Sequence, residues 1–473
     1  MARRFGALPA STVAVTRAAL IEALVSAVRI EVFMSRTRRL VQAYWLTLYL
    51  VIAVVPVILL LVIERARYRN IATELSVLAG LLALSLLIVA FALPTRVHSI
   101  LASFGIEKVL RSHRLVALIS LSLLGLHILL AVIGDPRGIS IFNLPAAPRP
   151  VWAACASTLA LTLLISSALR RRRRQPRYEG WRMAHAGLAI LALTFAGLHI
   201  FWLGGLTTRP GMRFSYAVLG EIVLMIAIRR YLWLPLRASR RAYLVDSVRP
   251  VSGNAVTVTV RAHGHSGLPF QAGQFAWLKI GTSPFVFEEH PFTIASTAER
   301  PHLKEFTIKA LGDFSELLIG LRPGRKIYLD GPYGRFTIDG LRSSGFVFVA
   351  GGVGITPMMS MLRTLADRAD TASHLLLVGA RSAADLMMRS ELAELSHRLN
   401  LRIIEVVQDA PPDWRGERGR IDGALLDRVL PRRTRHHDYF LCGPPAMVVG
   451  VGRQLRERGI SARRIHTEQF EVV

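Results

Sequence analysis

The stretch LVALISLSLLGLHILLAVI, residues 115–133, has one histidine as its only ionisable side chain. A run of about 20 apolar residues is long enough to cross the hydrocarbon core of a bilayer as a helix. Five similar runs precede residue 241: 41–63, 75–93, 151–169, 183–206 and 214–228, the last extended by YLWLPL. Buried core helices of a soluble protein are the alternative, but a soluble fold rarely holds six such runs. The sequence therefore predicts a six-helix transmembrane bundle over residues 41–240.

The whole chain is apolar and strongly basic. Of its 473 residues 52% are hydrophobic and 19% charged, and the mean hydropathy is +0.39. These values exclude a disordered chain and disfavour a purely soluble enzyme. A formal net charge of +27 would indicate nucleic-acid binding in a soluble protein. Here the basic residues flank the apolar runs, so they indicate membrane topology, and we expect no nucleic-acid partner.

The loops between the apolar runs predict the orientation in the membrane. Segments 94–114 and 170–182 are richer in arginine and lysine than the loops on the opposite side. By the positive-inside rule both termini are expected in the cytoplasm, in a multi-pass protein of the cell (inner) membrane. Residues 1–40 do not resemble a signal peptide, because charges interrupt their apolar part. This N-terminal segment is expected to form a membrane-surface helix or, equally, an ordinary packing helix.

Two cysteines, Cys155 and Cys442, limit the possible metal chemistry. They are too few for a four-thiolate iron–sulfur cluster or a thiolate zinc site, and the chain has no CxxCH motif for covalent haem attachment. A metal would have to be held mainly by histidine or carboxylate.

Four histidines occur in two pairs with the same spacing. His113 precedes the third apolar run and His127 lies within it, and His185 and His199 both lie within the fifth. Fourteen residues of helix rise about 21 Å and return to within about 40° of the same face. The third and fifth helices run in the same direction, so His113 can pair with His185 and His127 with His199. A single membrane histidine could simply bond a neighbouring helix, but two matched pairs predict two stacked haems, each held by two imidazoles.

The sequence pattern changes after residue 240. Short β-rich runs such as AVTVTVR (255–261) come first, with glycine and proline between them. Strand and helix patterns then alternate, beginning with FVFVAGG (346–352). The first pattern predicts a small antiparallel barrel over 241–340, and the second predicts a doubly wound parallel α/β domain over 341–473.

Three motifs follow one another in the predicted barrel: HPFT (290–293), GDFS (312–315) and GPYGRF (331–336). In this order they resemble the FAD-binding barrel of the ferredoxin–NADP reductase superfamily, in the form found in NADPH oxidases and ferric reductases. The resemblance implies that Thr293 hydrogen-bonds the isoalloxazine edge. It also implies that His290, Pro291 and Phe292 form the ring site and that Lys309 and Ser315 contact the FAD diphosphate.

Two further motifs lie in the predicted parallel domain. FVFVAGGVGITP (346–357) is a strand, a glycine-rich turn and a helix start, an arrangement that lets backbone N–H groups reach a pyrophosphate. It resembles the GGxGxTP nucleotide loop of the same superfamily, which implies cofactor contacts by Gly351, Gly352, Gly354, Thr356 and Pro357. CGPP (442–445) resembles the family's motif beside the nicotinamide, formed here by Cys442, Gly443 and Pro444; a redox-sensing role for Cys442 is the alternative.

Two arginines and the C-terminal aromatic complete the expected site. Arg381 follows a predicted strand, where an arginine can accommodate a 2′-phosphate, and Arg420 is a second candidate. Both favour NADPH over NADH. The tail resembles family tails in which an aromatic covers the flavin, which implies this role for Phe470, although three residues follow it. Thr293, Cys442 and Phe470 are the expected catalytic residues.

The arrangement of residues 41–473 resembles a prokaryotic NADPH oxidase or ferric reductase. The resemblance implies that electrons pass from NADPH through FAD and two b-type haems across the membrane to O2, giving superoxide. A ferric or cupric reductase with the same electron path is the first alternative, and a haem subunit for an extracytoplasmic partner enzyme is another. A six-helix channel or transporter with a nucleotide-sensing domain belongs to a different class and would hold no haem. The chain has no DxDxDG calcium loop, and we expect no obligatory protein activator.

Overall fold

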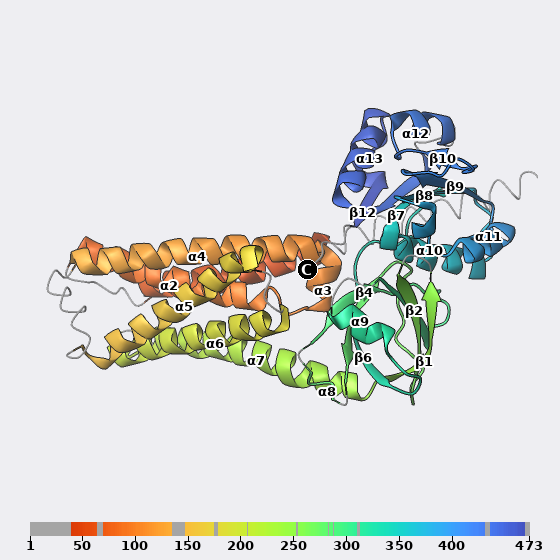
Figure 1. Ribbon diagram of the computed structural model, residues 1–473. Helices are drawn as coiled ribbons and strands as arrows, with labels where there is room; N and C mark the ends of the chain where they lie inside the picture. The colour runs from red at the N-terminus through yellow and green to blue at the C-terminus, as the bar shows by residue number, and fades with distance from the viewer. Residues whose placement is uncertain are drawn as a thin grey trace, which may run out of the picture.

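The computed structural model describes residues 39–63, 70–134, 147–174, 178–205, 207–251, 254–281, 283–286, 288–309, 313–430 and 436–468. The predicted N-terminal surface helix therefore lies almost entirely outside the described residues. An elongated helical bundle occupies one half of the molecule, and two sheet domains lie at one end of it (Figure 1).

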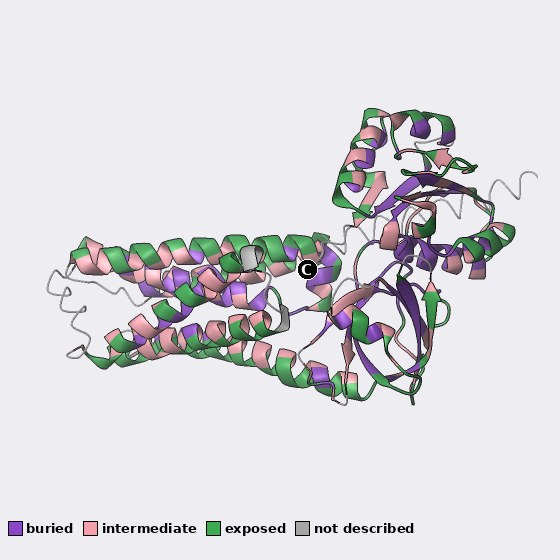
Figure 2. Cartoon of the chain, viewed as in Figure 1, coloured by how far each residue is buried: buried purple, intermediate pink, exposed green. Residues whose placement is uncertain are grey.

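The described part of the bundle contains six helices that are long and apolar enough to cross a membrane, as the sequence predicts. The first covers 39–58 and continues as the π-helix η1 (Leu59–Ile63). The others are α2 (Ile71–Ala92), α4 (Ile106–Gly134), α5 (Arg149–Arg174), α6 (Tyr178–Leu203) and α7 (Pro210–Ile228), and α7 continues through the π-helix η4 (Arg229–Trp233) into α8 (Leu234–Ser239). A short helix, α3 (His98–Phe104), connects α2 to α4. Exposed residues cover the outer faces of these helices (Figure 2), and many of them are large and apolar, as lipid contact requires.

Small residues and hydroxyl groups hold the helices together in pairs. Ser120 of α4 donates to the Ala83 carbonyl of α2 over 2.7 Å, and Ser157 of α5 donates to the Ala192 carbonyl of α6 over 2.9 Å. Such contacts replace the hydrophobic driving force that is missing between helices in lipid. An apolar cluster then joins α2, α4, α5 and α6 in the middle of the bundle: Leu87, Leu124, Ala160, Leu161, Leu188 and Ala192.

The antiparallel domain follows directly after α8. Its strands are β1 (Tyr243–Val251), β2 (Ala255–Ala262), β3 (Phe275–Ile280), β4 (His290–Thr293), β5 (Leu303–Lys309) and β6 (Lys326–Tyr333), in the order β4-β3-β6-β1-β2-β5. The helix α9 (Asp313–Ile319) lies against β5 and β2. Alternation places Val258, Val260, Phe306 and Leu278 inside, where they are fully buried. We refer to this domain as the barrel.

The C-terminal domain is a parallel sheet covered by helices. Its strands are β7 (Phe346–Gly351), β8 (His374–Ala380), β9 (Leu401–Val407), β10 (Glu417–Arg418), β11 (Asp438–Cys442) and β12 (Ile465–Glu468), in the order β10-β9-β8-β7-β11-β12. Its helices are η5 (Gly352–Gly354), α10 (Ile355–Asp367), η6 (Ala383–Asp385), α11 (Arg389–Arg398), α12 (Gly423–Val429), α13 (Pro445–Glu457) and η8 (Ala462–Arg464). The strand order reverses between β7 and β11, and ligands of such sheets bind at the carboxyl ends of the strands beside that point. The doubly wound fold predicted for this region is confirmed.

Candidate functional site

The four membrane histidines meet in two pairs, one near each end of the bundle. The ring centroids of His113 and His185 are 6.4 Å apart, and those of His127 and His199 are 6.5 Å apart. An imidazole nitrogen lies about 2 Å from a metal that it ligates and the ring centroid about 1.1 Å farther, so two opposed ligands place their centroids about 6.3 Å apart. Both pairs therefore have the separation of two imidazoles on opposite sides of one metal.

The second ring nitrogen of three histidines is held by backbone. Nδ1 lies 2.9 Å from the Ala90 carbonyl in His113, 2.8 Å from the Ser76 carbonyl in His127, and 2.8 Å from the Pro150 carbonyl in His199. An Nδ1–H that donates to a carbonyl fixes the tautomer and leaves Nε2 as the ligand atom, which is the usual arrangement of a metal-bound histidine. His185 differs, because its Nδ1 is buried without a partner in the described structure and its ring packs against Trp181 at 5.0 Å.

The surroundings of the pairs suit a flat macrocycle better than a bare ion. In the described part of the chain no three His, Cys, Asp or Glu side chains gather in an arrangement that could hold a bare metal ion, so each level offers one histidine pair as candidate ligands. A Cβ added to Gly125, Gly187 or Gly197, close to the ligands in sequence, would meet no atom within 4 Å. Gly80 is different, because a Cβ there would lie 2.9 Å from Nδ1 of His127. Gly80 thus makes room for that imidazole against α2.

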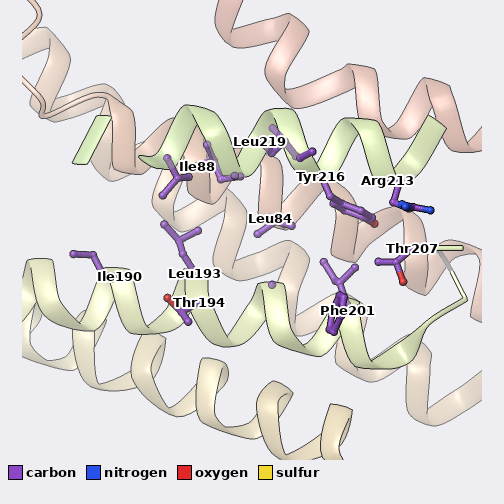
Figure 3. A pocket seen from close by; sticks show the side chains of 15 residues that line it. Leu84, Ile88, Ile190, Leu193, Thr194, Phe201, Thr207, Arg213, Tyr216 and Leu219 are labelled. Atoms are coloured by element: carbon purple, nitrogen blue, oxygen red, sulfur yellow. The ribbon is translucent and has the colours of Figure 1, made fainter. Parts of the chain in front are cut away.

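A separate cavity of about 630 Å³ lies between α2, α6 and α7. Its walls are mainly apolar, and Thr207, Arg213 and Tyr216 lie together toward one end of it (Figure 3). None of the four histidines lines it. The cavity is therefore distinct from the candidate ligand positions.

The HPFT motif forms the whole of strand β4 at the edge of the barrel sheet. Thr293 pairs with Phe275 of β3 and is buried, and its Oγ1 has no hydrogen-bond partner in the described structure. A buried hydroxyl without a partner is costly unless a ligand completes it. The His290 ring packs on Phe314 of α9 at 4.2 Å between centroids. An unsatisfied donor beside aromatic rings fits the edge of an isoalloxazine ring.

The two predicted diphosphate contacts lie on neighbouring elements. Lys309 ends β5 and is half-buried, and Ser315 lies in α9. The pKa of Asp385 in η6 is lowered, first by hydrogen bonds from Ser382 and then by the charge of Lys309. Lys309 thus faces the parallel domain, in the region between the two sheet domains.

The glycine loop and the CGPP motif pack directly on each other. Strands β7 and β11 are parallel neighbours, with Cys442 opposite Ala350. A Cβ on Gly354 would lie 2.4 Å from the Cys442 carbonyl oxygen, and one on Gly443 would lie 3.0 Å from Gly351 Cα. Only glycine permits this approach, which brings both motifs to the point where the strand order reverses. Thr356 lies in the first turn of α10 there and donates to the Val353 carbonyl over 2.9 Å, and Pro357 follows it.

Cys442 is buried as a thiol, not poised as a thiolate. Burial, and then the nearby carboxyl of Glu468, raises the pKa of Cys442 well above its ordinary value. Reactive cysteines have a lowered pKa and a thiol that is partly exposed to solvent, so the environment of Cys442 disfavours a redox-sensing role. Pairing with β12 places Glu468 opposite Cys442.

Glu468 is a residue that the sequence reasoning missed. Its Oε2 is buried without a partner in the described structure. Burial, and then the charge of Glu107 at the start of α4, raises the pKa of Glu468 to about 8. The carboxyl is therefore mainly protonated at neutral pH and lies beside the expected nicotinamide position. Its place two residues before the C-terminal aromatic was the only sequence signal.

The two candidate arginines lie near the carboxyl ends of β8 and β9. Arg381 is 83% exposed and pairs with Asp409 at 3.1 Å, and Arg420 donates to Gln408 over 3.3 Å. Both are thus near the expected adenosine side of the nucleotide, with partners that a bound phosphate would have to replace. Phe470 lies outside the described residues.

Three family models match successive parts of the chain. Residues 79–196 match the ferric reductase like transmembrane component, 241–337 an FAD-binding domain, and 348–452 an oxidoreductase NAD-binding domain. The chain thus joins a ferric-reductase-like membrane domain to an FAD-binding domain and an oxidoreductase NAD-binding domain.

Known relatives match up to about half of this chain. The propane 2-monooxygenase reductase component of Rhodococcus jostii is 31% identical over 48% of this chain and 62% of the relative. NADH-cytochrome b5 reductase 2 of Pyricularia oryzae is 30% identical over 34% of this chain and 50% of the relative. The matches thus span about half to three fifths of these proteins. The crystal structure of the Amycolatopsis cytochrome P450 reductase GcoB is 28% identical, with a TM-score of 0.43 over 49% of this chain and 69% of that one.

We expect Thr293→Val to weaken FAD binding about fivefold, because one hydrogen bond contributes about 1 kcal/mol. The same change should raise the apparent Tm of protein stripped of FAD, since the unsatisfied hydroxyl is lost. Fluorescence titration with FAD and thermal unfolding measure the two effects. The matched control is Thr259→Val, at another buried barrel hydroxyl for which the described part of the chain offers no hydrogen-bond partner. It should stabilise the stripped protein and leave FAD affinity unchanged; equal affinity loss in both variants would contradict the assignment of Thr293.

We expect Glu468→Gln to change how stability depends on pH. Because the folded-state pKa of Glu468 is raised to about 8, the unfolded chain releases this proton first as pH rises from about 4.5. The free energy of unfolding should therefore fall between about pH 4.5 and pH 8. In Glu468→Gln the decrease that Glu468 contributes should be absent. Thermal unfolding at pH 5 and pH 8 tests this: the variant's advantage should be larger at pH 8. The exposed Glu457, changed to glutamine, is the control.

Proposed function

We propose that this chain, a ferric-reductase-like membrane domain joined to FAD- and NAD-binding domains, is a transmembrane NADPH oxidase that reduces O2 to superoxide. In this proposal its cofactors are NADPH, FAD and two b-type haems, with the iron held by His113 with His185 and by His127 with His199. The single observation that carries it is the pair of matched imidazole separations, 6.4 and 6.5 Å, at two levels of the bundle.

His113 with His185, and His127 with His199, would each supply two imidazoles to one iron, and such ligation would suit electron transfer rather than binding of O2 to the metal. FAD supplies the conversion between the two-electron chemistry of a nicotinamide and one-electron transfer. The chain's own groups bind and orient. The Ala90, Ser76 and Pro150 carbonyls fix three imidazole tautomers, and Thr293 offers its hydroxyl to the flavin ring. The glycines of the β7–α10 turn let backbone N–H groups approach the nucleotide phosphates.

The arrangement in the membrane follows from the loop charges. Basic residues are concentrated on the side that carries the barrel, so we place both termini and the reductase domains in the cytoplasm. The membrane in this proposal is the cell (inner) membrane. His113 and His185 are then the inner pair, and His127 and His199 the outer pair. The acceptor meets the protein at the outer side.

A ferric or cupric reductase is the second candidate, because the matched membrane model carries the ferric reductase description. It would use the same residues and a different acceptor. A channel or transporter with a nucleotide-sensing domain has no need of paired imidazoles with oriented second nitrogens.

The test is a visible spectrum of the purified protein before and after NADPH, followed by an acceptor assay. We expect haem bands that NADPH reduces and cytochrome c reduction that superoxide dismutase suppresses. A protein that contains flavin but no haem would contradict the proposal. Haem reduction without superoxide, together with reduction of a ferric chelate, would favour the second candidate.

We expect the double variant His127→Ala, His199→Ala to lose about half of the haem and to keep the inner pair reducible by NADPH, because the two levels share no ligand. Pyridine haemochrome content and the rate of inner-haem reduction measure this. Gly80→Val should also weaken the outer site, since its side chain would occupy the space of the His127 ring. Gly220→Val on α7 is the control, because a Cβ there meets nothing within 4 Å. Complete haem loss in the double variant would contradict two independent sites.

We expect Arg381→Ala to raise KM for NADPH about tenfold and to leave KM for NADH unchanged, because a contact of about 1.4 kcal/mol to the 2′-phosphate is lost. Steady-state reduction of ferricyanide with each nucleotide measures this. Arg398→Ala, which removes an exposed arginine paired with Asp367, is the control. An equal rise of KM for both nucleotides would show that Arg381 does not discriminate between them.

A further inference from the structure

A carboxylate with no exposed side-chain surface, Glu289, lies where the barrel meets the helical bundle. Its Oε1 is 2.8 Å from a guanidinium nitrogen of Arg96, 2.8 Å from one of Arg182 and 2.5 Å from one of Arg230. Its Oε2 lies 3.6 Å from Nζ of Lys279 in β3. The three arginines come from three parts of the bundle: the turn after α2, the first turns of α6, and the π-helix η4. One barrel side chain thus contacts three separate bundle segments.

Further contacts surround this carboxylate. Asp330 within β6 lies 3.2 Å from Arg96 and accepts a hydrogen bond of 2.7 Å from Tyr333. The Arg96 guanidinium lies 3.5 Å from the ring centroid of Trp277. We define the Glu289 cluster as Glu289 and Asp330 together with the cations Arg96, Arg182, Arg230 and Lys279.

The cluster is charged and shielded from water. Its side chains are between 0% and 21% exposed. Burial alone would raise the pKa of Glu289, but the charges of Arg96, Arg230 and Arg182 lower it below its ordinary range, so the carboxylate is ionised. Four cations face two carboxylates, and loss of one carboxylate would leave buried positive charges uncompensated. Breaking a buried pair on one side is strongly destabilising, unlike the loss of an exposed pair.

The cluster connects the two candidate cofactor sites by a short path. Arg182 lies three residues before His185 on α6, and Glu289 lies four residues before Thr293. The hydrogen bond of 2.8 Å between them therefore joins the helix of an inner histidine to the strand of the expected flavin contact. Glu289 itself stands outside the HPFT motif, and no cofactor role was expected of it. Small displacements of reacting groups, even from changes at a distance, can slow a reaction about a hundredfold.

We propose that Glu289 is a positioning residue that holds strand β4 against helix α6 and so keeps the flavin half close enough to the inner histidine pair for electron transfer. The inference rests on the proposed function. Loss of the carboxylate should uncouple the two halves: reduction of the flavin by NADPH continues, and reduction of the haem slows.

The experiment compares two rates in the purified full-length chain. Ferricyanide reduction by NADPH reports the flavin half alone, and anaerobic stopped-flow at the haem bands reports transfer into the bundle. For Glu289→Gln we expect ferricyanide reduction within about twofold of the unaltered protein and haem reduction slowed about tenfold or more. FAD and haem contents should be unchanged. Arg182→Gln changes the bundle side of the same hydrogen bond. It should also slow haem reduction and leave ferricyanide reduction unchanged, and it replaces Glu289→Gln as the test if Glu289→Gln folds poorly.

The matched control is Asp246→Asn, a carboxylate-to-amide change in the same barrel. Asp246 pairs with Arg261 at 3.1 Å, and both side chains are exposed, so the pair is far less shielded. Both rates should stay unchanged in this variant. The proposal is overturned if the haem in Glu289→Gln and Arg182→Gln is reduced as fast as in the unaltered protein. It is also overturned if ferricyanide reduction and haem reduction fall together in these variants.

Trypsin gives an independent readout of docking. Arg240 and Arg241 are exposed in the connection between α8 and β1. We expect faster cleavage there in Glu289→Gln than in Asp246→Asn, because an undocked barrel leaves the connection open. If the unaltered protein contains no haem, the proposed function fails, and the cleavage rates alone then decide whether Glu289 holds the two halves together. Equal cleavage in both variants would count against the docking role.

Discussion

An imidazole inside an apolar bundle has two ring nitrogens, and no solvent water is available there to hydrogen-bond either of them. In three of the four membrane histidines one nitrogen meets a backbone carbonyl of an adjacent helix, which orients the ring toward its partner across the bundle. The helix pairs α2–α4 and α5–α6 provide those carbonyls, so helix packing and ligand orientation are one arrangement. The two matched ring separations follow from it, and the direction of electron flow that we propose depends on them.

The reductase half lies at one end of the bundle, and its candidate nucleotide site depends on a different constraint, the close approach of two backbone segments. Glycines at 351, 354 and 443 let the β7 turn and the CGPP segment touch, which opens the carboxyl edge of the sheet to a nucleotide. The barrel then presents Thr293 on its edge strand β4, with a hydroxyl that has no hydrogen-bond partner among the described residues. Glu468 lies opposite Cys442 on β12, and burial, followed by the charge of Glu107 in α4, raises its pKa to about 8.

Much of this architecture could be predicted from sequence, because its signals are local. Runs without charge define spans, equal histidine spacing defines two levels, and motif order defines the two sheet domains. The carbonyls that orient the histidines carry no side-chain signal and could not be predicted. Glu289 looks like a surface acid beside Glu288, and its partners Arg230 and Arg182 are 59 and 107 positions away in the chain. Glu468 was missed because the local sequence does not show that β12 pairs with β11 and places this carboxyl opposite Cys442.

The π-helix η4 has a consequence for how this chain can vary. A π-turn is an α-helix with one residue inserted, so it widens the last helix at Arg229–Trp233. Two consecutive arginines of this turn bind different partners. Arg229 donates to the Thr95 and Arg96 carbonyls, and Arg230 donates to Glu289. Deleting a single residue from this turn would restore ordinary helical register and swing every downstream atom about the helix axis by about 100°. A change of length in this turn would therefore rotate the barrel relative to the rest of the bundle.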